Sequence, residues 1–334
     1  MRPCQHGAMA GSAAQRHSHR TVVVIGGSGF LGRHVTAELA RRGIRAVTVS
    51  RREAPDPSSS VEHRRCDITT DPASVRRTLD GCAAVINASS YVGDDTELQE
   101  RVNVDGVRHV AAAAEAMNIP LVHLSTAGVY GDLPFAGGEE GDYAPNPESS
   151  LSLARARGDE LALRGRATLI RPLFVSGVGD THFLRPLLHL HVRLGAWIAG
   201  GAARLSVAPA ELVAAAAVGA VEGRLQGFAP ELVHAVPDRP VTVRELLTPT
   251  LTEWGALPHR SLTADDAIER LAAVGVPARK VRQFARDYFI SSRLLRRLIS
   301  DGPGVPAVSL AARAWYTAQR PTAPVPPKPP TMSA

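Results

Sequence analysis

A glycine-rich turn between an apolar run and an amphipathic segment constrains this chain more than any other feature. Residues 21–25 read Thr-Val-Val-Val-Ile, which predicts a buried strand. The turn that follows reads Gly26-Gly27-Ser28-Gly29-Phe30-Leu31-Gly32. Apolar residues then recur with helical spacing through residue 42, and Gly43 stands where a helix commonly ends. This strand–loop–helix order predicts a site for the diphosphate of a dinucleotide, and an ordinary tight turn is the alternative.

Further strand and helix patterns alternate after this turn. Strands are expected at 44–49, 83–87, 121–125 and 168–171, and helices between them at 71–79, 95–117 and 151–164. The alternation predicts an α/β protein with a Rossmann-type, doubly wound parallel sheet and a smaller C-terminal substrate-binding lobe.

The chain divides into four expected parts. They are a flexible N-terminal extension over 1–19, an NADP-binding Rossmann domain over 20–175, a mixed substrate-binding lobe over 176–320 and a proline-rich tail over 321–334. We expect the lobe to return a strand to the sheet near 231–235, and a helix to follow over 241–253.

Charge and composition exclude several classes of function. The formal net charge is +6, and residues 276–300 carry seven basic residues against a single acidic one, Asp287. No nucleic-acid-binding motif accompanies this cluster, so we interpret it as an amphipathic helix with a solvated basic face. The most apolar stretch, 207–221, is shorter than the roughly 20 residues of a membrane-spanning helix. Three cysteines without metal-ligand spacing and no apolar leader favour a cytoplasmic protein that binds no metal.

The residues after the second expected strand bear on the choice of dinucleotide. NAD enzymes place a carboxylate there for the adenine ribose, whereas an arginine accommodates a 2′-phosphate. Here the strand ends in Ser50, Arg51 and Arg52, and the first carboxylate is Glu53. A planar guanidinium that is always charged suits a phosphate. The sequence therefore favours NADP, with NADPH preferred and NADH as the alternative; Arg52 could also be a solvated surface charge.

Five further segments follow the turn in a characteristic order. They are Cys66-Asp67-Ile68, Asn87-Ala88-Ser89-Ser90, Asn103-Val104-Asp105-Gly106, Leu124-Ser125-Thr126-Ala127-Gly128-Val129-Tyr130-Gly131 and Arg171-Pro172-Leu173-Phe174-Val175. With the turn, they resemble the short-chain dehydrogenase/reductase superfamily, in its extended and atypical branches related to sugar-nucleotide epimerases. The resemblance runs from Thr21 to about Leu298.

The resemblance implies roles for individual residues. Cofactor contacts would come from Gly26, Ser28, Gly29, Phe30, Leu31, Gly32, Ser50, Arg51, Arg52, Asp67, Ile68, Asn87, Ala88, Ser89, Arg155, Pro172, Leu173 and Phe174. Thr126 takes the position of the family's catalytic Ser/Thr, with Ser125 beside it. We expect Ser90, Tyr91 and Phe183 to contact the substrate.

The sequence departs from the family at its Tyr-x-x-x-Lys pair, which supplies a proton and anchors the nicotinamide ribose. Leu151 and Arg155 occupy these positions, and a shift of one residue brings Ser152 and Ala156 instead. No lysine occurs before Lys280. A guanidinium can hold a ribose hydroxyl or a phosphate, but it is a poor proton donor. Proton transfer of this kind accelerates a reaction by about 10²–10⁴.

Two functions remain open. The first is an NADPH-dependent ketoreductase in which Thr126 and Ser125 hydrogen-bond to the carbonyl oxygen, while water or an acidic hydroxyl of the substrate gives the proton. Here the chain resembles ketoreductases that tailor aromatic polyketides, including angucyclinones, in actinomycete antibiotic pathways. The second is an NADP-binding sensor or partner protein that has lost its chemistry. A sugar-nucleotide epimerase or dehydratase is disfavoured, because these enzymes use the tyrosine as a base.

A small aromatic molecule is the expected substrate, and the protein is expected to act as a monomer or homodimer. Phe183, Leu187, Leu188, Trp197 and Ile198 could line an aromatic-binding pocket or simply pack in the core. Tyr91 is the candidate for a substitute proton donor, whereas the resemblance implies a structural role for Tyr130.

Overall fold

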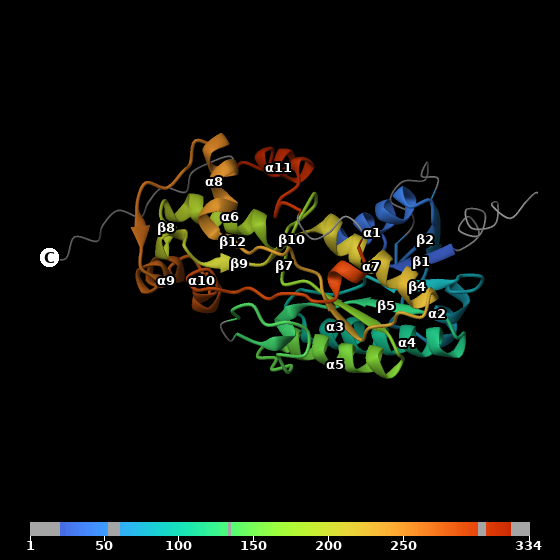
Figure 1. Ribbon diagram of the computed structural model, residues 1–334. Coiled ribbons are helices and arrows are strands. Elements are labelled where there is room, and N and C mark those ends of the chain that lie inside the picture. The colour runs from blue at the N-terminus through green and yellow to red at the C-terminus, as the bar shows by residue number, and fades with distance from the viewer. Residues whose placement is uncertain (1–20, 53–60, 133–134, 300–304, 322–334) are drawn as a thin grey trace, which may run out of the picture.

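The computed structural model describes residues 21–52, 61–132, 135–299 and 305–321. The expected N-terminal extension lies outside the described residues, as does the proline-rich tail beyond residue 321. A parallel sheet with helices on both faces forms one half of the molecule, and a smaller lobe forms the other (Figure 1).

Every pairing in the main sheet is parallel, as the sequence predicts. Its strands are β1 (Thr21–Ile25), β2 (Arg45–Ser50), β3 (Glu62–Arg65), β4 (Ala84–Asn87), β5 (Leu121–Leu124), β6 (Thr168–Arg171) and β11 (Leu232–His234). Their spatial order is β11-β6-β5-β4-β1-β2-β3. The order reverses between β1 and β4, and open α/β sheets bind ligands at this switch point. The short, half-exposed β3 was not expected, because its sequence, Glu-His-Arg-Arg, lacks apolar residues.

Two helical layers cover the sheet. One contains α1 (Phe30–Arg41) and α7 (Ala210–Leu225); the other contains α2 (Pro72–Thr78), α4 (Gly106–Ala116) and α5 (Ser150–Arg164). Before α4 the chain forms α3 (Thr96–Glu100) and a π-helical turn, η2 (Arg101–Asp105). Alternate residues of β1 point to opposite faces, so Val24 packs in the core formed with α7 and Val23 in the core formed with α4. Both cores explain why β1 has no polar residue after Thr21.

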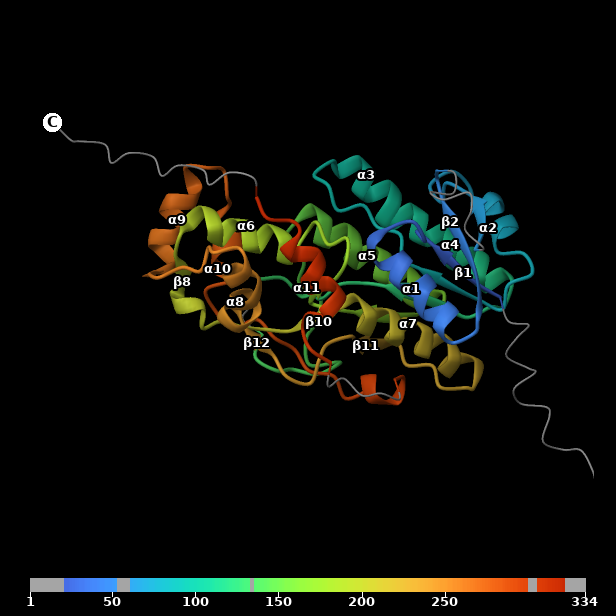
Figure 2. The ribbon, with the colours of Figure 1, turned by 90° about the horizontal axis from the view of Figure 1, so that it is seen from above.

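The lobe follows β6 in the chain and lies to one side of the sheet (Figure 2). Its strands are β7 (Phe174–Ser176), β8 (Trp197–Ile198), β9 (Arg204–Leu205), β10 (Val207–Pro209), β12 (Val241–Thr242) and β13 (Ser261–Leu262). Its helices are α6 (Leu184–Leu194), α8 (Val243–Glu253), α9 (Ala264–Ala272), α10 (Ala278–Gln283) and α11 (Leu310–Thr317), with 3₁₀ turns η4 (Ala199–Gly201) and η5 (Leu295–Arg297). The strands pair only two at a time, β7 with β10, β9 with β12 and β8 with β13. Helix α7 and strand β11 leave the lobe and return to the sheet.

The expectation of one amphipathic helix over residues 276–300 is wrong. Helix α10 ends at Gln283, and the chain then runs extended, with bridges from Tyr288 to Leu205 and from Phe289 to Ala136. Tyr288 and Ile290 are both buried, and this spacing of two suits an extended chain. Arg286 pairs with Asp132 and Arg296 pairs with Asp238, although Arg296 remains exposed.

The apolar stretch at 207–221 forms β10 and most of α7, which packs on α1 and the sheet. Among the helices in the described ranges, none combines the length and apolar character needed to span a bilayer.

Candidate active site

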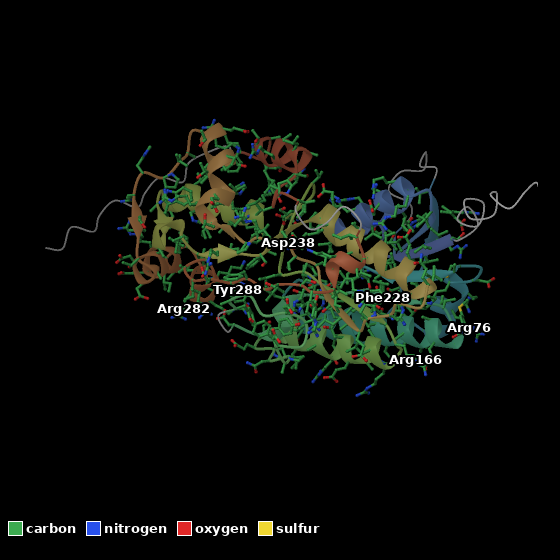
Figure 3. All side chains as sticks on the ribbon, viewed as in Figure 1. Arg76, Arg166, Phe228, Asp238, Arg282 and Tyr288 are labelled. Carbon is green, nitrogen blue, oxygen red and sulfur yellow. The ribbon has the colours of Figure 1, made fainter. Side chains whose placement is uncertain are left out.

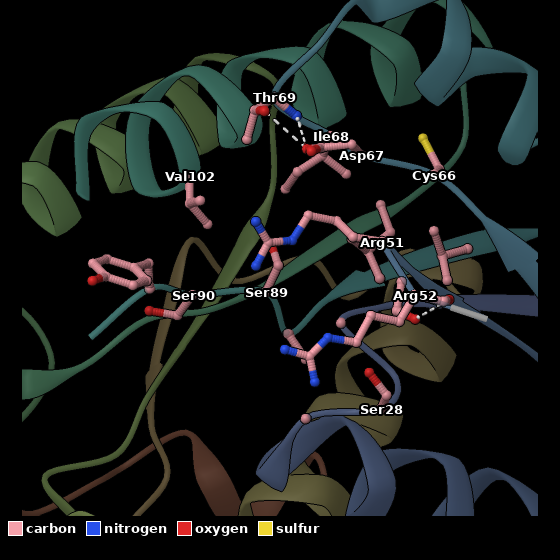
Figure 4. Close-up of a pocket in the computed structure, with 17 residues that line it drawn as sticks. Ser28, Arg51, Arg52, Cys66, Asp67, Ile68, Thr69, Ser89, Ser90 and Val102 are labelled. Atoms are coloured by element: carbon pink, nitrogen blue, oxygen red, sulfur yellow. Dashed lines mark hydrogen bonds between the residues drawn. The ribbon is translucent and has the colours of Figure 1, made fainter. Parts of the chain in front are cut away.

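A pocket of about 270 Å³ opens at the switch point of the sheet (Figure 4). Twelve of the expected site residues line it: Gly26, Ser28, Gly29, Ser50, Arg51, Arg52, Asp67, Ile68, Ala88, Ser89, Ser90 and Tyr91. Five more lining residues were not expected: Ile25, Val49, Cys66, Thr69 and Val102. Ile25, Val49 and Cys66 lie at or next to strand ends, and Val102 lies in η2.

The glycine-rich turn passes very close to the loop after β4. Gly26 has φ +76°, and a Cβ there would lie 2.8 Å from the Ser89 backbone nitrogen. A Cβ on Gly32 would lie 2.1 Å from the Gly26 carbonyl oxygen, so α1 can start here only with glycine. The capping residue Gly29 has no side chain to cap α1. Gly29 lines the pocket, and the first amides of α1 have no side-chain acceptor, which suits a diphosphate.

Arg51 and Arg52 extend from the end of β2 into the pocket (Figure 4). Both are exposed, and within the described residues neither guanidinium has a hydrogen-bond or ion-pair partner. Their turn is held through its backbone carbonyls, since the Ser50 hydroxyl donates to the Arg52 carbonyl at 3.0 Å. Across the pocket, Asp67 is fixed by Thr69, whose amide and hydroxyl donate to it at 2.9 and 2.8 Å. Two free cations on a pocket wall fit a bound phosphate.

The loop after β4 is held from behind by two asparagines. Asn87 is fully buried and does not line the pocket; its Oδ1 accepts from the Ser89 amide at 3.1 Å and from Ser89 Oγ at 2.6 Å. Asn103 accepts from the Tyr91 amide at 3.0 Å and donates to the Tyr91 carbonyl at 2.8 Å. Asn103 lies in the π-helical turn η2, a feature frequent at functional sites. Asn87 therefore supports the pocket wall, and its predicted cofactor contact is replaced by this role.

Thr126 stands at the start of the 3₁₀ turn η3 (Ala127–Tyr130), directly after β5. Its Oγ1 accepts from the Gly128 amide at 3.1 Å. Among the described residues no acceptor receives the Thr126 hydroxyl hydrogen, so this hydrogen is free to bind a carbonyl oxygen. The neighbouring Ala127 amide donates to the Pro172 carbonyl at 2.8 Å, which joins the Thr126 turn to the predicted closing segment Pro172–Phe174.

Ser125 faces the interior, and its expected role as a second donor to substrate is corrected. It is 3% exposed, and its hydroxyl donates to Asp159 Oδ2 at 2.5 Å. The same carboxylate oxygen accepts from Arg171 Nη2 at 2.6 Å, and both partners are buried. Donation to a substrate would break this bond and leave a buried carboxylate with one partner fewer, which is costly. Sequence reasoning missed Asp159, whose only signal is its place one helical turn after Arg155.

Arg155 reaches the site from the position where the family has its lysine. Helix α5 begins with a capping box between Ser149 and Ser152, which sets the helical register and places Leu151 one turn before Arg155. Arg155 Nη1 donates to Ser90 Oγ at 2.6 Å, and Nη2 donates to the Leu124 carbonyl at 2.9 Å. Arg155 thus ties the pocket wall at Ser90 to the end of β5, and its contact with a cofactor stays a prediction.

His123 completes the buried cluster behind Thr126. Burial away from water lowers its pKa to about 4, although the nearby Asp159 opposes the shift. Its Nδ1 lies 3.2 Å from Asn87 Nδ2, so this nitrogen accepts and the ring proton is on Nε2. Nε2 lies 3.7 Å from Asp159 Oδ1, an oxygen without a hydrogen bond in the described chain. The histidine is therefore neutral near pH 7, and it adds no charge to the Asp159–Arg171 pair.

The two tyrosines considered as proton donors, Tyr91 and Tyr130, have different surroundings. Tyr130 is fully buried, its hydroxyl lies 2.7 Å from His234 Nε2, and burial raises its pKa. It is a structural residue, as the resemblance implied. Tyr91 lines the pocket, and in the described ranges its hydroxyl has no hydrogen-bond partner. Tyr91 stays the candidate for a substrate contact.

A second hollow, of about 460 Å³, lies between α6 and α10. Phe174 and Phe183 stack on its wall with ring centroids 4.6 Å apart and planes 19° apart. Leu187 also lines this hollow, whereas Leu188, Trp197 and Ile198 are buried in the cores of the lobe. Of the five residues expected to line an aromatic pocket, only Phe183 and Leu187 do so. No cluster of three or more histidine, cysteine or acidic side chains that could hold a metal occurs in the described ranges.

Comparison with known proteins agrees with this geometry. Residues 22–184 match the NAD dependent epimerase/dehydratase family. The chain is similar to this family over 163 of its 334 residues, from β1 to the first residue of α6. Together with the reductases described next, the match makes it an oxidoreductase of the atypical short-chain dehydrogenase/reductase type, with a pocket for a nicotinamide dinucleotide.

Several reductases are similar to the chain. It is 28% identical over 254 residues to the 4-hydroxy-2-methyl-3-oxo-4-farnesyl-3,4-dihydroquinoline-1-oxide ketoreductase of Stigmatella aurantiaca, covering 70% of this chain and 72% of that protein. It is 34% identical over 143 residues to the dTDP-4-dehydrorhamnose reductase of Mycobacterium tuberculosis, covering 41% of this chain and 42% of that one. With this second enzyme the chain therefore shares less than half of its length.

Solved structures share the fold over most of the chain. A short-chain dehydrogenase/reductase superfamily protein from Agrobacterium tumefaciens with bound NAD has a TM-score of 0.69 at 19% identity, over 90% of this chain and 97% of that one. The UDP-glucose 4-epimerase of Brucella ovis in complex with NAD has a TM-score of 0.66 at 19% identity, over 89% and 96%. At this identity the likeness shows the fold alone.

Proposed function

We propose that this protein is an NADPH-dependent ketoreductase that reduces a carbonyl of a bulky aromatic substrate. A polyketide such as an angucyclinone, made in antibiotic biosynthesis, is the substrate type we favour. The observation that carries the proposal is that Arg51 and Arg52, which have no partner among the described residues, lie on the pocket wall where an NAD enzyme needs a carboxylate. The similar Stigmatella enzyme supports it, because its name describes a ketoreductase of a quinoline oxide.

The described residues fit NADPH. The bare amides at the start of α1 suit the diphosphate, and Arg51 and Arg52 suit a 2′-phosphate on the adenine ribose. When bound, NADPH supplies the hydride for the carbonyl carbon. The pocket wall at Ser89 and Ser90 is held in place by Asn87 and Arg155, so little rearrangement is needed on binding.

Thr126 is the residue that would act on the carbonyl oxygen. Its hydroxyl hydrogen is free, and a hydrogen bond to the oxygen stabilises the negative charge that develops there. Leu151 cannot deliver a proton, and the Arg155 guanidinium holds its protons too tightly to do so. We therefore propose that water or an acidic hydroxyl of the substrate protonates the alkoxide.

The test is to mix the protein with NADPH and a panel of aromatic ketones and to follow nicotinamide absorbance and alcohol formation. Thr126→Val should lower kcat by about 10²–10³, whereas Thr126→Ser should retain most activity, because it keeps the hydroxyl. Tight NADPH binding without turnover across the panel would support the sensor instead. Turnover of a nucleotide sugar without net NADPH consumption would support an epimerase.

A further inference from the structure

We propose that the hollow between α6 and α10 binds an acidic group carried by the aromatic substrate, so that the enzyme selects aromatic ketones bearing a carboxylate or phenolate. This inference rests on the proposed reductase function and names the substrate class more narrowly. It is carried by the combination of an aromatic wall with cations that have no counter-ion in the part of the chain that the structure describes.

The wall offers flat apolar surface. Phe174 and Phe183 stack nearly parallel, and the Phe284 ring lies 6.0 and 6.3 Å from them, centroid to centroid. All three rings are close to fully buried, so they present faces and edges to the hollow instead of moving freely. Fused aromatic rings bind well to such surfaces, because offset and edge contacts between rings add to the burial of apolar area.

The charges around the rings have one sign. Arg185, Arg193 and Lys280 line the hollow together with His182 and His189, and no lining residue is a carboxylate. Within the described chain, the three cations form no ion pair. This differs from Arg204 on nearby β9, which binds Asp287 at 2.5 Å. Cations left without partners around an apolar wall favour a ligand that is both aromatic and anionic.

A short backbone segment, residues 172–174, joins the proposed reaction centre to the wall of the hollow. The Pro172 carbonyl accepts from Ala127, the neighbour of Thr126, and Phe174 follows two residues later on the wall of the hollow. A substrate of several fused rings with its ketone at Thr126 would extend past Phe174 toward Lys280. Lys280 belongs to the basic segment 276–300, and the inference gives this residue a role in binding.

The probe pair is an acetyl-substituted naphthalene carboxylic acid and its primary amide, which carry the same ketone and differ in charge. With NADPH present, the acid should have a KM about 10-fold lower than the amide, since each partly exposed cation contributes about 2- to 5-fold. The preference should shrink as salt is raised. Calorimetry of each compound with the NADPH-loaded protein measures binding independently of turnover.

Variants assign the effect to the hollow. Lys280→Gln, Arg185→Gln and Arg193→Gln should each lower the preference by about 2- to 5-fold, and the triple variant should abolish it. Lys280→Arg should keep it. The control is Arg282→Gln. Arg282 is exposed on α10, the helix that carries Lys280, but it does not line the hollow and lies on the outside of the lobe (Figure 3).

The outcomes separate this inference from the reductase proposal. Reduction of both compounds with equal KM would overturn the anionic selectivity and leave the reductase standing. Tighter binding of the acid without reduction of either compound would support the hollow and count against the reductase. Binding of neither compound, or a preference that survives in the triple variant, would overturn the inference.

Discussion

Two groups of arginines lie at the carboxyl ends of the same sheet, and their surroundings are opposite. Arg51 and Arg52, after β2, are exposed and have no partner in the described chain. Arg171, at the end of β6, is buried and binds Asp159 at 2.6 Å, and Arg155 donates to Ser90 and Leu124. Arginine is therefore available to a ligand after β2, whereas Arg155 and Arg171 stabilise the packed structure.

The difference teaches how to assign an arginine near a site. A buried guanidinium needs a counter-charge and acceptors within the protein, because removal from water is costly. An exposed guanidinium keeps its hydration and loses little by remaining free, so it is available to bind a ligand. The first group should therefore control ligand affinity, and the second should control stability.

The largest effect is expected at Asp159. Asp159→Ala removes the one carboxylate that pairs with the buried Arg171 among the described residues and leaves its charge uncompensated, so the free energy of unfolding should fall by about 3–5 kcal/mol. Denaturant unfolding measures the change. Asp159→Asn keeps the shape of the side chain but loses its charge. It therefore separates the effect of the lost charge from the effect of the lost side-chain volume. A loss below about 1 kcal/mol would show that the pair is not stabilising.

The pH dependence of stability tests the buried side of the comparison further. Burial lowers the pKa of both His123 and His191 to about 4, from an ordinary value near 6.5. Unfolded histidine takes up a proton below about pH 6.5 while the folded histidine stays neutral, so stability is fully present above this pH and falls between about 6.5 and 4. Each histidine contributes a slope of up to about 1.4 kcal/mol per pH unit.

His123→Gln should reduce this slope by up to about 1.4 kcal/mol per pH unit. His191→Gln in α6 is the matched control, because it removes a histidine of equal pKa far from the Asp159 cluster. An unchanged slope in both variants would mean that neither histidine is buried in its neutral form.

Arg51→Ala addresses the exposed group. The variant should weaken NADPH binding by about 10- to 100-fold and NADH binding little, because a charge-assisted bond to the 2′-phosphate is lost. Calorimetry with both cofactors measures the ratio, and Arg52→Ala tests its neighbour. Stability should change by less than about 0.5 kcal/mol. Equal losses for NADPH and NADH would show that these cations do not bind the phosphate.

The smallest effect is expected at Arg157, two residues after Arg155 on the same helix. Its ion pair with Glu100 spans 3.2 Å, and both side chains are about half exposed. Arg157→Ala should change the free energy of unfolding by less than about 0.5 kcal/mol and leave cofactor affinity unchanged. A loss as large as that of the Asp159 variant would break the distinction between buried and exposed arginines.

Much of the Rossmann half could be predicted from the sequence because its signals are local. Alternating apolar runs, the glycine-rich turn and Gly43 after α1 each depend on neighbouring residues, and all the strands expected in this half are present. Beyond residue 175, the expected strand near 231–235 and the expected helix over 241–253 are present as β11 and α8, but the other elements of the lobe were not predicted. Residues 276–300 were expected to be a helix, but contacts of Tyr288 with Leu205 and Gly131 hold part of this segment extended.

The sequence by itself determined the parallel α/β fold, the diphosphate turn and the missing Tyr/Lys pair, because each follows from residue types at short spacing. Only the tertiary structure decided that Ser125 turns inward to Asp159 while Thr126 keeps a free hydroxyl. It also decided which arginines are paired, and it gathered Phe174, Phe183 and Lys280 around one hollow. The physical reason is that burial and pairing depend on groups far apart in the chain, and their partners appear only when strands and helices pack together.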